Sequence, residues 1–158
     1  GSGTILNEVL EAAKLLETYG IAADVWSVTS YKALYYDAIE AARSNRLHPT
    51  AKQRRKPFIA QALESTDGPI VASSDYMKAL PELLSGHLDR PIHALGTDGF
   101  GRSETREALR DFFEVDRNFV TAAALSALAQ DGKIEAKAAA EAIKKLGIDP
   151  EREHPHKR

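Results

Sequence analysis

The spacing of apolar residues predicts that helices alternate with short strands along the chain. The first helix is expected at residues 4–19, where one helical stripe is apolar, Ile5, Val9, Ala12 and Leu16. Gly20 followed by the apolar Ile21 is typical of a Schellman helix end, in which the glycine takes a left-handed conformation. The pattern is therefore that of an amphipathic helix with one buried face and a defined end.

Similar patterns divide the rest of the chain. Short strands rich in apolar residues are expected at 23–30, 69–74 and 90–96. Helices are expected at 30–45, 58–65, 75–88, 103–113, 117–131 and 135–147. Ser30 is a candidate cap, Pro81 is expected to interrupt its helix, and Gly147 ends the last helix as Gly20 ends the first. Residues 46–57, with two prolines and five basic residues, are expected to form a solvated loop.

Strands that alternate with helices favour an α/β fold, with a mainly parallel sheet covered by helices on both faces. Three strands are few for such a sheet, and the opening Gly-Ser-Gly has the composition of a strand-to-helix turn. We therefore expect a further strand immediately before Gly1. Residues 1–150 are expected to form one domain, and residues 151–158 a polar, flexible tail.

Composition narrows the classes of function. Of the 158 residues, 43% are hydrophobic and 28% are charged, and the net charge of -2 gives no reason to expect nucleic acid or membrane binding. The chain has no cysteine, which excludes disulfides, thiolate metal ligands and cysteine nucleophiles. A cytoplasmic location is consistent with this composition.

The stretch "GTDGFGRS" is spaced like a phosphate loop. Gly96, Gly101, Arg102 and Ser103 match the motif G-x-x-x-x-G-K-[ST] except that arginine replaces lysine. Guanidinium is a poor substitute for the compact ammonium group, and Asp98 would repel a phosphate. A nucleotide-binding enzyme is therefore one hypothesis, but not the favoured one.

The favoured interpretation of the same stretch is a turn between a strand and a helix. Ser103 would cap a helix spanning 103–113, and Glu104 and Glu107 would lie near its positive end. Arg106 and Arg110 would complete a charged face. Gly96, Gly99 and Gly101 would then serve backbone conformation and close packing.

Two further features are candidates for contacts with partners. The five histidines lack metal-ligand spacing, and His48 in "LHP" is a candidate for structuring its loop or for an interface. The basic cluster "KQRRK" at 52–56 could dock on a partner protein, in which case charge reversal at Arg54 and Arg55 would weaken assembly.

Several longer stretches resemble the C-terminal domain of the homodimeric type of pyruvate dehydrogenase first component. They are "GSGTILNEVLEAAKLL", "DVWSVTSY", "NRLHP", "ASSDYMK", "LGTDGFGRSETREALR" and "FFEVDRNFVTAAALSALA". They recur in the order typical of that family and cover nearly the whole chain. Transketolase carries a looser relative of the glycine turn in its own last domain and is the nearest alternative.

The resemblance implies a three-layer α/β/α domain with a mixed, mainly parallel sheet. It also implies that the parent enzyme oxidatively decarboxylates pyruvate with thiamine diphosphate and Mg²⁺, and passes the acetyl group to lipoyl groups of a dihydrolipoyl acyltransferase. The family's cofactor motif is a GDG stretch followed by paired asparagines. This chain has "TDG" at 97–99 and isolated asparagines.

No catalytic, cofactor-binding or metal-binding residue can therefore be transferred to a position in this chain. The resemblance implies a domain that supports the preceding thiamine-binding domains and a homodimer partner. Asp98, Arg102 and Arg106 become candidates for domain or subunit contacts, together with His48 and the glycine turn.

Overall fold

The computed structural model describes residues 1–157 as an α/β fold. Its strands are β1 (Ile70–Ser73) and β2 (Ile92–Leu95). Its α-helices are α1 (Leu6–Thr18), α2 (Tyr31–Leu47), α3 (Phe58–Ala62), α4 (Ala79–Glu82), α5 (Arg106–Phe112), α6 (Arg117–Gln130) and α7 (Ala136–Lys145). Short 3₁₀ turns are η1 (Gly3–Ile5), η2 (Ser85–His87) and η3 (Pro155–Lys157).

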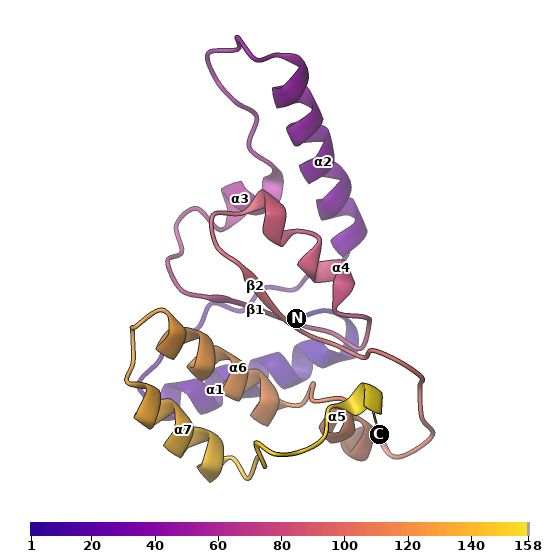
Figure 1. Ribbon diagram of the computed structural model, residues 1–158, viewed down its shortest axis with the longest axis vertical. Helices are drawn as coiled ribbons and strands as arrows, with labels where there is room; N and C mark the ends of the chain where they lie inside the picture. The colour runs from indigo at the N-terminus through magenta and orange to yellow at the C-terminus, as the bar shows by residue number, and fades with distance from the viewer. Residues whose placement is uncertain (158) are drawn as a thin grey trace.

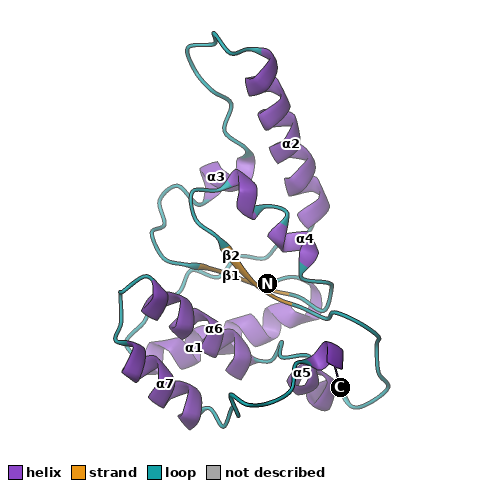
Figure 2. Cartoon of the chain, in the orientation of Figure 1, coloured by secondary structure: helices purple, strands orange, loops and turns teal. Residues whose placement is uncertain are grey.

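The two strands pair in parallel and form the middle layer of the domain. Ile70 lies opposite Ile92 and Ser73 lies opposite Leu95. Helices α2, α3 and α4 lie on one side of the strands, and α1, α5, α6 and α7 lie on the other (Figures 1 and 2). The expected α/β fold with helices on both faces is therefore confirmed.

Apolar side chains fill the space on each side of the sheet. One cluster joins α2, the sheet and the segment after α4, with Tyr31, Ala38, Ala72, Leu84 and Ile92 buried. A second joins α1, α6 and α7, through Leu16, Leu125, Ala139 and Ala142. The stripe predicted for the first helix is confirmed, because Ile5, Ala12 and Leu16 are buried.

The helix ends follow the sequence signals at several positions. Gly20 has φ +74°, and the Ile21 amide donates to the Leu16 carbonyl at 3.0 Å, which is the Schellman pattern. Gly147 ends α7 in the same way, with φ +77°. The Ser30 hydroxyl accepts a hydrogen bond from the Ala33 amide at 3.1 Å and caps α2 as expected.

The expected strand at 23–30 is wrong, because this segment is extended coil in the described structure. Among the described residues, its strand-like pairing is with Gly1 alone. The Gly1 nitrogen donates to the Trp26 carbonyl at 2.8 Å, and the Val28 amide donates to the Gly1 carbonyl at 2.9 Å. A strand needs a ladder of such bonds, and one residue cannot provide it. The further strand before Gly1 stays a prediction.

The helix expected at 75–88 is broken into two short pieces, α4 and η2. Pro81 is not the point of interruption, because it lies inside α4. A proline in the first turn of a helix forfeits no intrahelical bond, since the amides of that turn have no partner there. The break follows Glu82 instead.

Helix α2 and the loop that follows it project from the body as an arm (Figure 1). The loop returns along the helix, where the Asn45 side chain bonds the amide and carbonyl of Arg55 at 2.8 and 2.9 Å. The Asp37 carboxylate accepts from the Phe58 amide at 2.6 Å. The solvated loop predicted at 46–57 is confirmed from position 48 onward.

The last described residues lie against α5 and the turn after β2. Arg152 donates two hydrogen bonds to the Asp111 carboxylate, at 2.9 and 2.8 Å. Its guanidinium lies 5.3 Å from the centre of the Phe119 ring. Flexibility of the segment 151–158 stays a prediction, although these contacts place part of it on the domain surface.

Candidate functional site

The "GTDGFGRS" turn leaves the carboxyl end of β2 and packs against the segment that follows β1. The Thr97 amide donates to the Tyr76 carbonyl at 2.8 Å. A Cβ atom on Gly96 would lie 2.3 Å from the same carbonyl oxygen and 3.1 Å from the Lys78 nitrogen. Only glycine therefore allows the two backbones to approach this closely.

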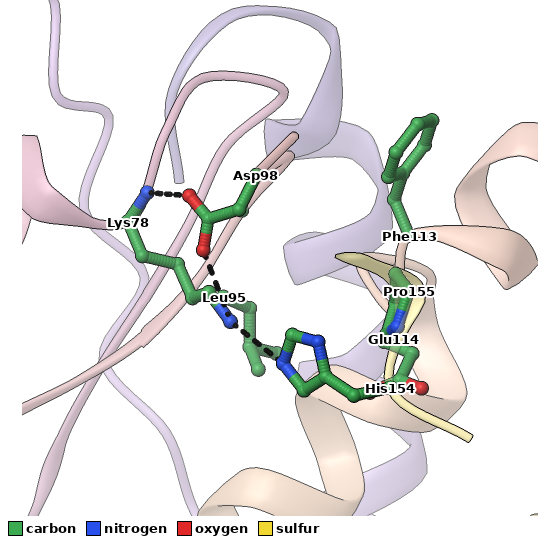
Figure 3. A pocket seen from close by; sticks show the side chains of 8 residues that line it. Lys78, Leu95, Asp98, Phe113, Glu114, His154 and Pro155 are labelled. Atoms are coloured by element: carbon green, nitrogen blue, oxygen red, sulfur yellow. Dashed lines mark hydrogen bonds and ion pairs between the residues drawn. The ribbon is translucent and has the colours of Figure 1, made fainter. Parts of the chain in front are cut away.

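Asp98 holds the turn to the segment after β1. Its carboxylate accepts from the Lys78 amide at 3.1 Å and lies 3.2 Å from the Lys78 ammonium group (Figure 3). Both oxygens are thus committed to one residue. Asp98 has a structural role in this arrangement.

A small cavity lies beside this pair, between the turn and the end of the chain (Figure 3). Its volume is about 20 Å³, which is room for about one water molecule. The His154 imidazole lines it, 3.4 Å from the Lys78 ammonium group. Partial burial, followed by the nearby charges of Lys78 and His156, lowers the pKa of His154.

The expected capping role of Ser103 is wrong. Helix α5 begins at Arg106, and the Thr105 hydroxyl accepts from the Ala108 amide at 3.3 Å. Arg102 lies over the ring of Phe112, at the far end of α5, with 3.9 Å between guanidinium carbon and ring centre. Residues 101–105 are not helical, so the cap is Thr105 and not Ser103.

This geometry also argues against the phosphate-loop hypothesis. A phosphate loop needs its last residues at the amino end of a helix, where backbone amides point to the anion. Here Arg102 and Ser103 precede that end, and the Asp98 carboxylate is bonded to Lys78 of the segment after β1. The glycine spacing therefore matches the motif, but the position of the helix start does not.

The structure gives the other glycines and arginines of the stretch different surroundings, although the sequence analysis grouped them together. Gly99 has φ +86°, a conformation that favours glycine, whereas a Cβ atom on Gly101 would meet nothing within 4 Å. Arg106 is exposed, whereas Arg110, one turn later on the same face of α5, is half-buried and donates to Glu8 of α1. The predicted charged face is therefore divided between two surroundings.

His48 lies far along the chain from this turn and ends α2. Its ring nitrogen Nδ1 lies 2.9 Å from the Ser44 carbonyl, and its amide donates to the same carbonyl at 3.0 Å. These bonds place His48 at the end of α2, and a role in structuring the loop stays a prediction. An interface role for it stays a prediction.

The basic cluster at 52–56 is only partly available to a partner. Arg55 pairs with Asp37 at 3.1 Å and lies 3.6 Å from Glu40, and Lys56 pairs with Glu64. Lys52 and Arg54 are exposed. Reversing the charge of Arg55 would thus disturb the arm itself.

The structure also contains a buried charge cluster that the sequence reasoning missed. Glu8 is 3% exposed, and its carboxylate accepts from the Arg110 side chain at 2.7 Å and from Arg117 Nε at 2.9 Å. Burial alone would raise the pKa of Glu8, but the hydrogen bonds and charges of Arg117 and Arg110 outweigh it and lower the pKa. The sequence did contain a signal for this cluster. Glu8 lies three residues after Ile5, so a charged residue falls on the apolar face of the first helix.

A second missed residue is Phe100, at the tip of the turn. Its side chain is 97% exposed and stands between two glycines. The signal was an aromatic residue in a turn, where a polar residue is the usual choice.

The residues present do not fit thiamine diphosphate and its metal ion. Within residues 1–157, no three histidine, aspartate or glutamate side chains are grouped to hold a metal. The nearest counterpart of the family motif is Asp98, whose oxygens are bound to Lys78.

No helix of the described chain combines the length and apolar character needed to cross a membrane.

Comparison with known proteins agrees with the fold and the motifs. Residues 1–116 match the family model of the transketolase-like TK C-terminal domain. Over 157 residues, 98% of this chain, the sequence is 52% identical to a pyruvate dehydrogenase E1 component of Pseudomonas aeruginosa, of which it covers 18%. Proteins of the same name from Cupriavidus necator and Escherichia coli (strain K12) are 47% and 46% identical, over 98% of this chain and 17% of each relative.

The chain therefore spans less than a fifth of the length of these relatives. The resemblance suggested by the motifs is confirmed, and the transketolase alternative is not favoured. The fold, the glycine turn and the family match lead to one conclusion. This chain belongs to the transketolase-like C-terminal domain family.

Proposed function

We propose that this chain is the C-terminal domain of a pyruvate dehydrogenase E1 component. The observation that carries the proposal is 40–52% identity to relatives of that name over 94–98% of the chain. The parent enzyme oxidatively decarboxylates pyruvate with thiamine diphosphate and Mg²⁺, and transfers the acetyl group to lipoyl groups.

Within that enzyme, the domain is a structural and dimer-forming module. Two features favour a structural role for the domain over a catalytic one. Both carboxylate oxygens of Asp98 contact Lys78, and the cavity beside these two residues has a volume of about 20 Å³. The cofactor is bound by the preceding domains of the parent.

The partners of the parent are a second copy of the enzyme and a dihydrolipoyl acyltransferase, and its location is the cytoplasm. Docking of the acyltransferase on the basic cluster 52–56 has less support, because Arg55 and Lys56 are engaged within the domain. Arg54 is the cleaner probe of that idea, since it is exposed.

The test has two arms. The parent enzyme should release carbon dioxide from pyruvate in a thiamine diphosphate- and Mg²⁺-dependent reaction, and should prefer pyruvate to a ketose phosphate donor. Calorimetric titration of the 158-residue chain with thiamine diphosphate should give no binding heat. Turnover of the ketose phosphate alone, or micromolar cofactor binding by the chain, would overturn the proposal.

A further inference from the structure

Apolar side chains are exposed together at the carboxyl edge of the sheet. Phe100 is 97% exposed, Tyr76 is 64% exposed and Met77 is 54% exposed. Tyr76 and Met77 follow β1, and Phe100 follows β2, so parallel pairing brings both segments to the same edge. We call Tyr76, Met77 and Phe100 the edge patch.

The backbones that carry the edge patch are in direct contact. The Thr97 amide donates to the Tyr76 carbonyl at 2.8 Å, and the absence of a side chain on Gly96 permits the approach. The Asp98 carboxylate bonds the Lys78 amide, one residue after Met77. The two segments that carry the edge patch are therefore bonded to each other at this edge of the sheet.

The loop that carries Phe100 is attached to the domain on both sides of that residue. On one side, Asp98 is bound to Lys78, and on the other, Arg102 lies on the Phe112 ring at 3.9 Å. Its neighbours Gly99 and Gly101 have no side chains to cover the ring. Figure 1 shows this segment, between β2 and α5, looping away from the body.

The chemistry of the edge patch is that of a protein interface. Aromatic residues, methionine and arginine are enriched at the centres of such interfaces, and here Arg102 and Arg106 follow Phe100 in the sequence. The cavity at this edge, about 20 Å³, is too small for an organic ligand. A protein surface with an apolar recess is the occupant that fits.

The length of the relatives favours surface of the same polypeptide as the occupant. This chain covers 17–18% of the E1 components that it matches, so most of the surface of a parent of that length lies outside these residues. Surface on the same polypeptide is tethered nearby, at the high effective concentration that favours contact between domains. An exposed aromatic anchor is then covered without a separate partner.

We propose that the edge patch docks into an apolar recess on the part of the parent enzyme outside these 158 residues, with Phe100 as the anchor. This rests on the proposed function only in that it requires a longer parent. It adds the surface through which the domain attaches, which the family match does not supply.

Photo-crosslinking in the parent enzyme tests the proposal. Phe100 is replaced by p-benzoylphenylalanine, the enzyme is irradiated, and crosslinked peptides are identified by mass spectrometry. The expected products join position 100 to enzyme residues outside this domain. Leu10 of α1, which is 44% exposed, is the matched control and should give a different product or none. Crosslinks from position 100 only to the acyltransferase or to the same domain of a second copy, or no crosslink, would overturn the proposal.

A second measurement uses the natural side chains. Phe100→Ser in the parent should increase the rate of proteolysis between this domain and the rest by several-fold, whereas Leu10→Ser should not. An unchanged rate for Phe100→Ser would count against the anchor. The pyruvate activity of the unsubstituted parent, measured in the same preparation, reports on the proposed function alone, so the two failures are distinguishable.

Discussion

The absent side chain of Gly96 lets the Tyr76 carbonyl lie against it, so that an added Cβ atom would be 2.3 Å from that oxygen. Gly96 follows β2 and Tyr76 follows β1, so the contact joins the two segments that leave the sheet at its carboxyl edge. The obstacle is backbone, which cannot rotate away as a flexible side chain can.

Gly96→Ala should therefore destabilise the domain by about 2 kcal/mol, the usual cost of forcing extra volume into a packed site. Gly101→Ala is the matched control, because a Cβ atom there meets nothing within 4 Å, and its effect should stay within about 0.5 kcal/mol. Urea unfolding of both variants measures the difference. Equal midpoints for the two variants would contradict the close contact.

Thr105 and Ser103 offer a test of where α5 begins. Thr105→Ala should cost about 1 kcal/mol, because the hydroxyl that accepts from the Ala108 amide is lost. Ser103→Ala removes a similar hydroxyl two residues earlier and should change stability by less than about 0.5 kcal/mol. If Ser103→Ala lowers the free energy of unfolding more than Thr105→Ala does, the helix begins earlier in solution.

Local signals predicted the elements whose partners lie nearby in sequence. The end of α1 at Gly20 and the cap of α2 at Ser30 depend on bonds within a few residues, and both were correct. The segment 23–30 has strand composition, but a strand also needs a neighbouring strand, and here it bonds only Gly1. Composition cannot supply that long-range partner.

The candidate site shows the same limit. The glycines of the turn were recognised, yet the sequence could not reveal that Gly96 faces Tyr76 or that Asp98 faces Lys78, because these contacts span about 20 residues. Ser103 and Thr105 are both suitable caps. The structure selects Thr105, whose hydroxyl accepts from the Ala108 amide, and composition alone does not distinguish the two.

Arg152 should fasten the end of the described chain to α5. Arg152→Ala removes the paired hydrogen bonds to Asp111, and we expect a loss of about 1 kcal/mol at most, since Asp111 is exposed. Hydrogen exchange of the α5 amides should rise in this variant. Arg152→Lys keeps the charge but not the two-pronged geometry, and should recover only part of the protection. Full recovery by lysine would show that charge alone suffices.

Glu8 should be a strong point of attachment between α1 and α6. Glu8→Gln keeps the shape but removes the charge that Arg110 and Arg117 bond, and should cost about 2 kcal/mol. Glu11→Gln, one turn further along α1 and 38% exposed at its side chain, should have a smaller effect in the same denaturation series. A larger effect at Glu11 would place the important ion pair elsewhere.

The same carboxylate should make stability depend on acid pH. Arg117 and Arg110 hold the pKa of Glu8 below its ordinary value of 4.5, so the unfolded chain binds the proton more readily than the folded one. The contribution of Glu8 is therefore fully present above pH 4.5, and it is lost as the pH falls through the lower pKa of the folded state. Glutamine has no proton to gain, so the stability difference between the wild type and Glu8→Gln should shrink as the pH falls below 4.5. Urea unfolding of both proteins from pH 7 downward measures this difference. A gap that stays constant down to the acid transition would mean that Glu8 is not held ionised by its two arginines.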